Sequence, residues 1–259
     1  MIRSLLPLLL LLAPVVGADE VREANLKLLS EKGFRVASSL PTDRYSELRP
    51  QEEIEKRLDA LISLVLWVTA PPGVLDDEAL KEKALSGDLA AWLTEDEKAI
   101  FKLDKATAQA EHIDTIGWQM ENVWGLAWVL GYNIAPPLQG QLQGEQARDL
   151  ILGFGVEGER QLRPVEEVLR MEDLFYCAHN AVRSAQLGRD TVPEGLTQLT
   201  QVEGFIPNLL AYFLFTSMAL SLSACNISSV RTSAESHCPV SDTPSNLSSS
   251  QFFFHSFER

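Results

Sequence analysis

The chain has 259 residues, a length that allows one large domain or two small ones, and 46% of its residues are hydrophobic. That composition supplies a sizeable core and excludes a chain that is disordered as a whole. The formal net charge of -14 repels phosphate backbones and anionic surfaces. We therefore do not expect the protein to bind nucleic acid, or to bind a lipid surface through basic patches.

An N-terminal export signal is predicted over residues 1–18. Arg3 supplies the positive charge, residues 5–16 form an apolar run, and small residues end the signal at Ala18. The apolar run is too short to span a bilayer comfortably. We therefore expect a secreted protein, or one of the secretory pathway, whose mature chain begins at Asp19. The alternatives are a retained N-terminal anchor and a mis-assigned start codon.

Two helices are expected in the first third of the chain. A short one over Asn25–Glu31 is closed by Gly33, since glycine takes the left-handed cap conformation without a steric penalty. A longer one starts at Pro50, whose missing N–H costs nothing in a first helical turn. Its apolar residues recur at three- and four-residue spacing, so it buries one face: Ile54, Leu58, Leu61, Ile62 and Val65.

The most informative segment runs from about His112 to Leu130. Before it, a helix is expected over about Asp77–Leu85, and Thr94 with Glu97 forms a capping box that opens another. Within the segment, apolar and tryptophan residues lie nearly all round the helix. We therefore expect this helix to be buried and central. One face holds Ile116, Met120, Val123, Ala127 and Leu130, with Trp124 and Trp128 flanking it and Trp118 and Val129 on the far side.

Two further helices are expected, over about Glu145–Leu152 and from Pro164 to Leu187. We find no alternating strand pattern of useful length and no internal repeat. The sequence therefore predicts an all-α domain over residues 19–195. It is an irregular array of about six to eight helices around the tryptophan-rich helix.

Residues 196–259 differ in character from the rest of the chain. No charged residue occurs over residues 205–225, which makes this apolar run a transmembrane candidate, although Pro207 and Asn208 weaken it. The following residues are rich in serine and low in complexity. A single-pass membrane protein anchored through residues 205–225 is therefore the alternative to a secreted protein.

The best candidate site is a polar stripe on the last helix. Glu172, Tyr176, His179 and Arg183 recur at steps of four, three and four residues, so they share one face, with Asn180 beside them. An acid, a phenol, an imidazole and a guanidinium in a row could bind a polar or anionic ligand, with His179 transferring a proton. The competing interpretation is a solvated face that carries ion pairs between helical turns.

Glu121 is the second candidate, because it lies beside Trp124 and Trp128 on the central helix. A carboxylate in that setting needs hydrogen-bond partners or takes a raised pKa. It is either a general base or a structural partner for an arginine such as Arg170 or Arg183.

No metal or cofactor site is predicted from the sequence. Glu111, His112 and Asp114 are close in sequence but show no repeated ligand spacing. The chain carries no P-loop, no dinucleotide fingerprint and no G-x-S-x-G elbow. We therefore expect neither a bound metal nor a cofactor.

Two motifs resemble those of the domain of unknown function 4272 family, a largely bacterial family. The central helix carries W-x-x-E-x-x-W-x-L-x-W-x-L-G over Trp118–Gly131. The last helix carries D-x-x-Y-x-x-H over Asp173–His179, followed by Arg183. The helix over Arg49–Ala70 is also similar to the opening helix of the family.

The resemblance covers about residues 24–193 and implies an α-helical domain. It highlights Glu121 and His179 without giving either one a role. Family members typically end in tryptophan-containing stretches, and Thr197–Arg259 contains no tryptophan. The segment after about residue 195 therefore departs from the family pattern.

Three functions remain open at this point. The first, which we favour, is a non-catalytic binding or scaffold module that holds an unknown protein or a small polar ligand at the stripe on the last helix. The second is a hydrolase in which His179 acts with Glu121 or Glu172, and it requires these side chains to converge in a cleft. The third is the membrane-anchored protein described above.

Overall fold

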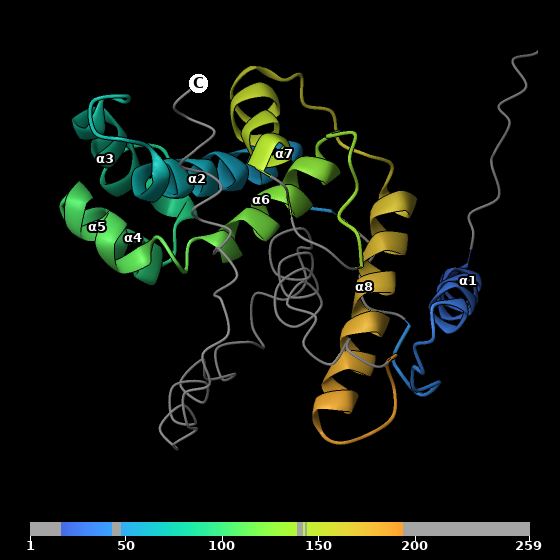
Figure 1. Cartoon of the computed structure of the whole chain (residues 1–259). Helices are drawn as coiled ribbons and strands as arrows, with labels where there is room; N and C mark the ends of the chain where they lie inside the picture. The colour runs from blue at the N-terminus through green and yellow to red at the C-terminus, as the bar shows by residue number, and fades with distance from the viewer. Residues whose placement is uncertain (1–16, 43–47, 139–141, 143, 194–259) are drawn as a thin grey trace, which may run out of the picture.

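The structure is a computed structural model that describes residues 17–42, 48–138, 142 and 144–193. These residues form helices and no strand, which confirms the predicted all-α fold (Figure 1). The α-helices are α1 (Ala18–Glu31), α2 (Gln51–Thr69), α3 (Asp77–Leu85), α4 (Glu95–Lys102), α5 (Lys105–His112), α6 (Gly117–Val129), α7 (Gly144–Arg148) and α8 (Val165–Gln186). A short 3-10 helix, η1 (Ala90–Trp92), and a π-helix, η2 (Asp149–Glu157), complete the described elements.

Two predicted segments fall wholly or mostly outside the described residues. Only Gly17 and Ala18 of the predicted export signal are described, and the apolar run over residues 205–225 is not. Among the helices that are described, none combines the length and the apolar character needed to cross a membrane.

Helices α2 and α6 lie against each other at the centre of the molecule (Figure 1). Every residue from Ala60 to Thr69 of α2 is buried, and so is every residue from Met120 to Leu130 around α6. A helix that is apolar nearly all round is stable in water only when other elements cover it on most sides. The prediction of a buried, central, tryptophan-rich helix is therefore confirmed.

The two tryptophans in the buried part of α6 have partners for their polar and aromatic groups. Trp124 donates its indole N–H to the carbonyl of Ile134 at 2.8 Å. The Arg163 guanidinium lies 4.7 Å from the centroid of the Trp128 ring, and its Nε donates to the Trp128 carbonyl at 2.6 Å. A buried indole N–H without an acceptor is costly. The bond from Trp124 to the Ile134 carbonyl therefore helps to position the chain that follows α6.

Helices α3, α4 and α5 gather at one end of α2 (Figure 1). Each is short and begins with a side-chain cap, supplied by Asp76, Thr94 and Asp104 respectively. The predicted capping box is confirmed, because the Thr94 side chain accepts the backbone N–H of Glu97 and the Glu97 side chain accepts the backbone N–H of Thr94. Caps of this kind satisfy first-turn N–H groups that have no partner within the helix.

Helix α1 packs along α8 and forms a second core (Figure 1). This core is built from buried side chains of both helices and of the segments that follow them: Leu29, Phe34, Cys177, Ala178, Ala181, Val182, Ala185 and Val192. Val168 and Phe175, nearer the start of α8, belong instead to the main core around α2 and α6. Helix α8 therefore joins the two cores.

Two predicted helix boundaries in the described residues are wrong. Helix α1 begins at Ala18 rather than at Asn25, and the acidic Asp19 and Glu20 of its first turn suit the positive end of a helix dipole. The helix predicted to start at about His112 starts later instead, because α5 ends at His112 and α6 begins at Gly117. The intervening sequence, Ile-Asp-Thr-Ile, consists of weak helix formers, which accounts for the break.

The helix predicted over Glu145–Leu152 also differs in the structure. It is the short helix α7 followed by the π-helix η2. Within η2, Gly155 packs so closely on α2 that an added Cβ would lie 2.4 Å from the Ile62 Cδ1 atom. A glycine at this point allows η2 to approach the central helix.

Candidate binding site

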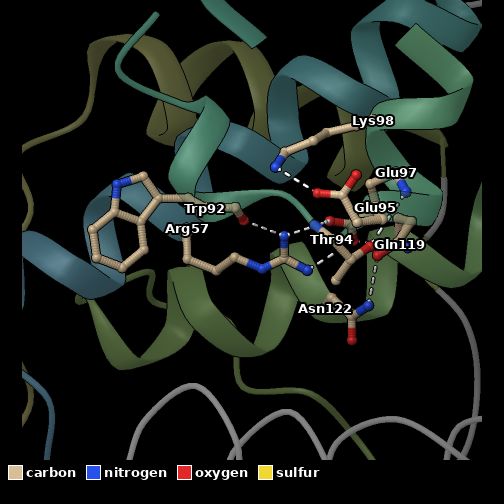
Figure 2. A network of polar contacts seen from close by, with 8 residues as sticks. All are labelled: Arg57, Trp92, Thr94, Glu95, Glu97, Lys98, Gln119 and Asn122. Carbon is tan, nitrogen blue, oxygen red and sulfur yellow. Dashed lines mark hydrogen bonds and ion pairs between the residues drawn. The ribbon is translucent and has the colours of Figure 1, made fainter. Parts of the chain in front are cut away.

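A buried ion pair joins α2 to α4. The Arg57 guanidinium donates from Nη1 to Glu97 Oε2 at 2.7 Å and from Nη2 to Glu97 Oε1 at 2.8 Å (Figure 2). The two side chains are only 4% and 7% exposed. Arg57 Nη1 also donates to the carbonyl of Trp92 at 2.6 Å. This parallel, two-bond geometry fixes both the guanidinium and the carboxylate.

The capping box of α4 holds the Glu97 carboxylate from its other side. Glu97 Oε2 accepts the backbone N–H of Thr94 at 2.9 Å, and the Thr94 hydroxyl oxygen accepts the N–H of Glu97 at 3.2 Å. Burial by itself would raise the pKa of Glu97, but the hydrogen bonds and charge of Arg57, with the Thr94 bonds, outweigh it and lower that pKa. Glu97 is therefore a carboxylate that serves as an acceptor.

The network continues from Glu97 to α6. Gln119 donates from Nε2 to Glu97 Oε1 at 3.4 Å, and Asn122 donates from Nδ2 to Gln119 Oε1 at 2.8 Å (Figure 2). Asn122 is 1% exposed, and no donor among the described residues reaches its Oδ1 atom. Three helices that are well separated in sequence, α2, α4 and α6, are thus joined by one line of polar side chains.

A hollow of about 260 Å³ opens beside Arg57. Its walls come from the start of α2 and from the segment between η1 and α4: Arg49, Glu53, Arg57, Ala91, Trp92, Leu93 and Thr94. Arg49 donates from Nη1 to Glu53 Oε2 at 3.0 Å, and both side chains are partly exposed. The hollow is therefore lined by both members of a partly exposed ion pair and by Arg57 of the buried ion pair.

The predicted stripe on α8 is present as a helical face, but its members differ in burial. Glu172 is buried, at 3% exposed, whereas Arg183 is exposed and donates to Gln186 on its own helix. Tyr176, His179 and Asn180 are half-buried between them. The face is thus neither wholly solvated nor a single open surface, and its role in binding stays a prediction.

Glu121 is buried on α6, as its place on the central helix indicated. Its helical neighbours belong to the main core, whereas the residues next to His179 on α8, Ala178 and Ala181, belong to the second core beside α1. Glu172 lies on α8 between Val168 and Phe175, which face the main core. The hydrolase pairing of His179 with Glu121 or Glu172 stays a prediction.

The ion pair of Arg57 and the hollow beside it were missed by the sequence analysis. A signal was present, because Arg57 lies three positions after Ile54 and four before Leu61, on the apolar face of this helix. The capping box had already singled out Glu97, a carboxylate at the start of a short helix. Nothing local in the sequence joins the two, since 40 positions separate them.

Within the described part of the chain, no three His, Cys, Asp or Glu side chains lie together as a set that could hold a metal ion. Glu111 and Asp114 are exposed and His112 is half-buried at the end of α5.

A family model described as Domain of unknown function (DUF4272) matches residues 22–203. No curated protein and no solved structure matches the chain. The matched range begins at Arg22, takes in α2 to α8 with the whole network of Arg57, and leaves the C-terminal part unmatched. Because this match spans more than half of the 259 residues, the chain belongs to the DUF4272 family.

Proposed function

We propose that this domain is a non-catalytic binding module and that the hollow beside Arg57 holds its ligand. One observation carries the proposal: Arg57, a buried residue whose guanidinium is fixed by two bonds to Glu97, lines a hollow of about 260 Å³. Binding sites commonly combine a preformed hollow with a few fixed polar groups. The ligand is a small polar molecule, or a side chain or chain end of a protein partner.

The chemistry of the hollow supports binding rather than catalysis. A general base needs a pKa near the working pH, whereas the pKa of Glu97 is lowered and its oxygens accept bonds from Arg57 and Thr94. Arginine only donates hydrogen bonds and does not exchange protons near neutral pH. The Thr94 hydroxyl caps α4 and has no imidazole beside it among the hollow's described walls. A nucleophile activated by a base is therefore not formed.

The proposal includes export of the protein. Cleavage after Ala18 would leave the contacts of Arg22, Asn25 and Leu29 with α8 in place, so the second core is compatible with a mature chain that begins at Asp19. Anchorage through residues 205–225 is the alternative. Mass spectrometry of the protein secreted from a host with an export pathway tests this part, and a retained Met1 peptide in the purified protein would refute it.

The binding proposal is tested by a nuclear magnetic resonance titration of the full chain with small polar fragments of positive, negative and neutral charge. The Trp92 indole N–H is the reporter, assigned by its loss in Trp92→Phe. We expect at least one fragment class to shift this signal. Shifts confined to Tyr176 and His179 would return the site to α8, and the absence of any saturable shift would refute the module as proposed.

A further inference from the structure

We infer that the hollow receives a partner polypeptide in an extended conformation, whose main chain pairs with the main chain of Leu93. This inference rests on the proposed function and names the kind of partner that the same hollow takes. It is carried by the backbone conformation of Leu93, by the bonds that fix the two peptide planes beside it, and by the balance of charge in the walls.

Leu93 is an extended residue between η1 and α4. Its backbone angles, φ -104° and ψ 141°, lie in the region of β-strands, and the backbone of Thr94 is also extended. In this conformation the N–H and C=O of one residue point to the same side of the chain. The C=O before it and the N–H after it point to the opposite side. Leu93 therefore has two hydrogen-bonding edges, like a residue of a strand.

The buried ion pair occupies one edge of Leu93. Arg57 donates from Nη1 to the C=O of Trp92 at 2.6 Å. Glu97 Oε2 accepts the N–H of Thr94 at 2.9 Å. Arg57 Nη1 also donates to Glu97 Oε2, at 2.7 Å, so both bonds reach the main chain from the same side (Figure 2). The ion pair thus bonds the two groups that a neighbouring strand would bond on this edge.

The other edge of Leu93 consists of its own N–H and C=O. The peptide bonds beside Leu93 are trans, so these two groups point away from Arg57 and Glu97. Within the described residues, neither group has a hydrogen-bond partner. Leu93 is only 6% exposed and lines the hollow, and a backbone polar group with so little access to water needs a partner. An extended residue of another chain supplies both, a C=O for the N–H and an N–H for the C=O.

The charges beside the hollow favour an uncharged group such as a peptide main chain. Arg49 and Glu53 form an ion pair with each other at 3.0 Å. Arg57 and Glu97 form the buried pair, so no surplus of either charge attracts an anion or a cation. A peptide main chain carries no charge and offers one donor and one acceptor per residue, which is what the edge of Leu93 lacks.

The experiment titrates the full chain with the uncharged peptide acetyl-Thr-Val-Thr-Val-Thr-amide, whose residues favour an extended conformation. The peptide is added to about 10 mM, because contacts of so few residues bind in the millimolar range. The nuclear magnetic resonance signal of the Leu93 backbone N–H is the readout, assigned by its loss from the spectrum of leucine-labelled Leu93→Met. We expect a saturable downfield shift of this signal, because its N–H gains an acceptor.

A fully N-methylated form of the same peptide is the control for main-chain pairing. It keeps every side chain but has no N–H to donate, and its methyl groups keep the two main chains apart. We expect its dissociation constant to be at least about tenfold higher. The protein is unaltered in this comparison, so a loss of folding cannot produce the difference.

A substitution in the wall tests whether the peptide enters the hollow. Ala91 is exposed and lines the hollow, so Ala91→Phe narrows the hollow and leaves the buried ion pair in place. We expect it to raise the dissociation constant of the peptide about tenfold. Ala24→Phe on α1 is the matched control, because Ala24 is also exposed but does not line the hollow. This control should leave peptide binding unchanged.

The outcomes distinguish the inference from the proposed function. A peptide that shifts the Trp92 indole signal but not the Leu93 N–H, or that binds equally well when N-methylated, would overturn main-chain pairing and leave the binding module standing. So would polar fragments that shift the Trp92 signal when the peptide does not. A Leu93 N–H that is protected from exchange without peptide and does not respond to it would show that the chain itself fills this edge, which also overturns the inference. If neither the peptide nor any fragment acts near Trp92, the proposed function fails as well.

Discussion

Arg22 of α1 and Asp173 of α8 form a buried ion pair 2.6 Å long, although 151 positions separate them in the chain. Arg22 also donates to the carbonyls of Leu40 and Pro41, and Asn25 donates to the second oxygen of Asp173. Both carboxylate oxygens thus have donors. The pair ties the N-terminal helix, and the segment after it, to the helix that joins the two cores.

We expect Arg22→Met to lower the free energy of unfolding by about 3–5 kcal/mol, because it leaves the Asp173 carboxylate buried without its guanidinium. Arg35→Met is the matched control. The Arg35–Asp190 pair also joins the N-terminal region to the segment that follows α8, but its side chains are 71% and 79% exposed. Its loss should change the free energy by no more than about 1 kcal/mol. Urea unfolding measures both, and equal losses in the two variants would contradict the assignment.

The Arg57–Glu97 pair predicts a specific dependence of stability on pH. The pKa of Glu97 is lowered in the folded state from its ordinary value of 4.5, so its stabilising contribution is fully present above that value. The contribution disappears as the pH falls through the lowered folded-state pKa. We expect Glu97→Gln to be much less stable than the unaltered protein at neutral pH, by about 3 kcal/mol, and the difference to shrink below about pH 4.

Urea unfolding of both proteins at a series of pH values provides this measurement. A difference that stays constant from neutral to acid pH would show that the charge of Glu97 is not what stabilises the pair. Asp88→Asn is a suitable control, because the pair that Asp88 makes with Lys56 lies on the surface, where one ion pair adds little stability.

Tyr132 gives a prediction at alkaline pH. Burial, and then the hydrogen bond to Asp149 at 3.0 Å with the charge of that carboxylate, raise its pKa to about 12. The folded state therefore favours the protonated phenol, and stability is lost as the pH rises from the ordinary tyrosine value of 10.0 through about 12. We expect an absorbance titration to show one late-ionising tyrosine that is missing in Tyr132→Phe. Ionisation of all tyrosines near pH 10 would contradict this.

The approach of η2 to α2 can be tested at Gly155. We expect Gly155→Ala to lower the free energy of unfolding by about 1–3 kcal/mol, because its Cβ would lie 2.4 Å from Ile62 Cδ1. Ile62→Val removes that atom, so the double variant should recover part of the loss. Strictly additive effects in urea unfolding would mean that the two residues do not limit each other.

Helices whose burial follows a local pattern were predictable from the sequence. The spacing of Ile54, Leu58 and Leu61 predicts α2. The helix that carries Trp124 and Trp128 is apolar on nearly all sides, and this predicts that α6 is buried. Both follow because helical periodicity places neighbouring side chains on known faces. The capping box of α4 was predictable for the same reason, since its two residues are three positions apart.

The site was less accessible to sequence reasoning, because tertiary packing decides which polar residues meet. Glu172 and Arg183 share a helical face by spacing, yet one is buried and the other exposed, because only the first half of α8 faces the main core. Arg57 and Glu97 meet only once α4 has docked on α2. The π-helix η2 was not predicted either, since its apolar residues also fit an ordinary helix.

The central claim is that the hollow beside Arg57 is the binding site of this domain, and one comparison tests it most directly. The shift of the Trp92 indole N–H is followed during titration with the small polar fragments in the unaltered protein, in Arg49→Gln and in the control Arg35→Gln, whose exposed ion pair shares no residue with the hollow. If the hollow is the site, the shift is saturable, and Arg49→Gln changes the dissociation constant of the fragment whereas Arg35→Gln does not. An indole signal that responds to no fragment in any of the three proteins, or binding that is equal in all three, would contradict the claim.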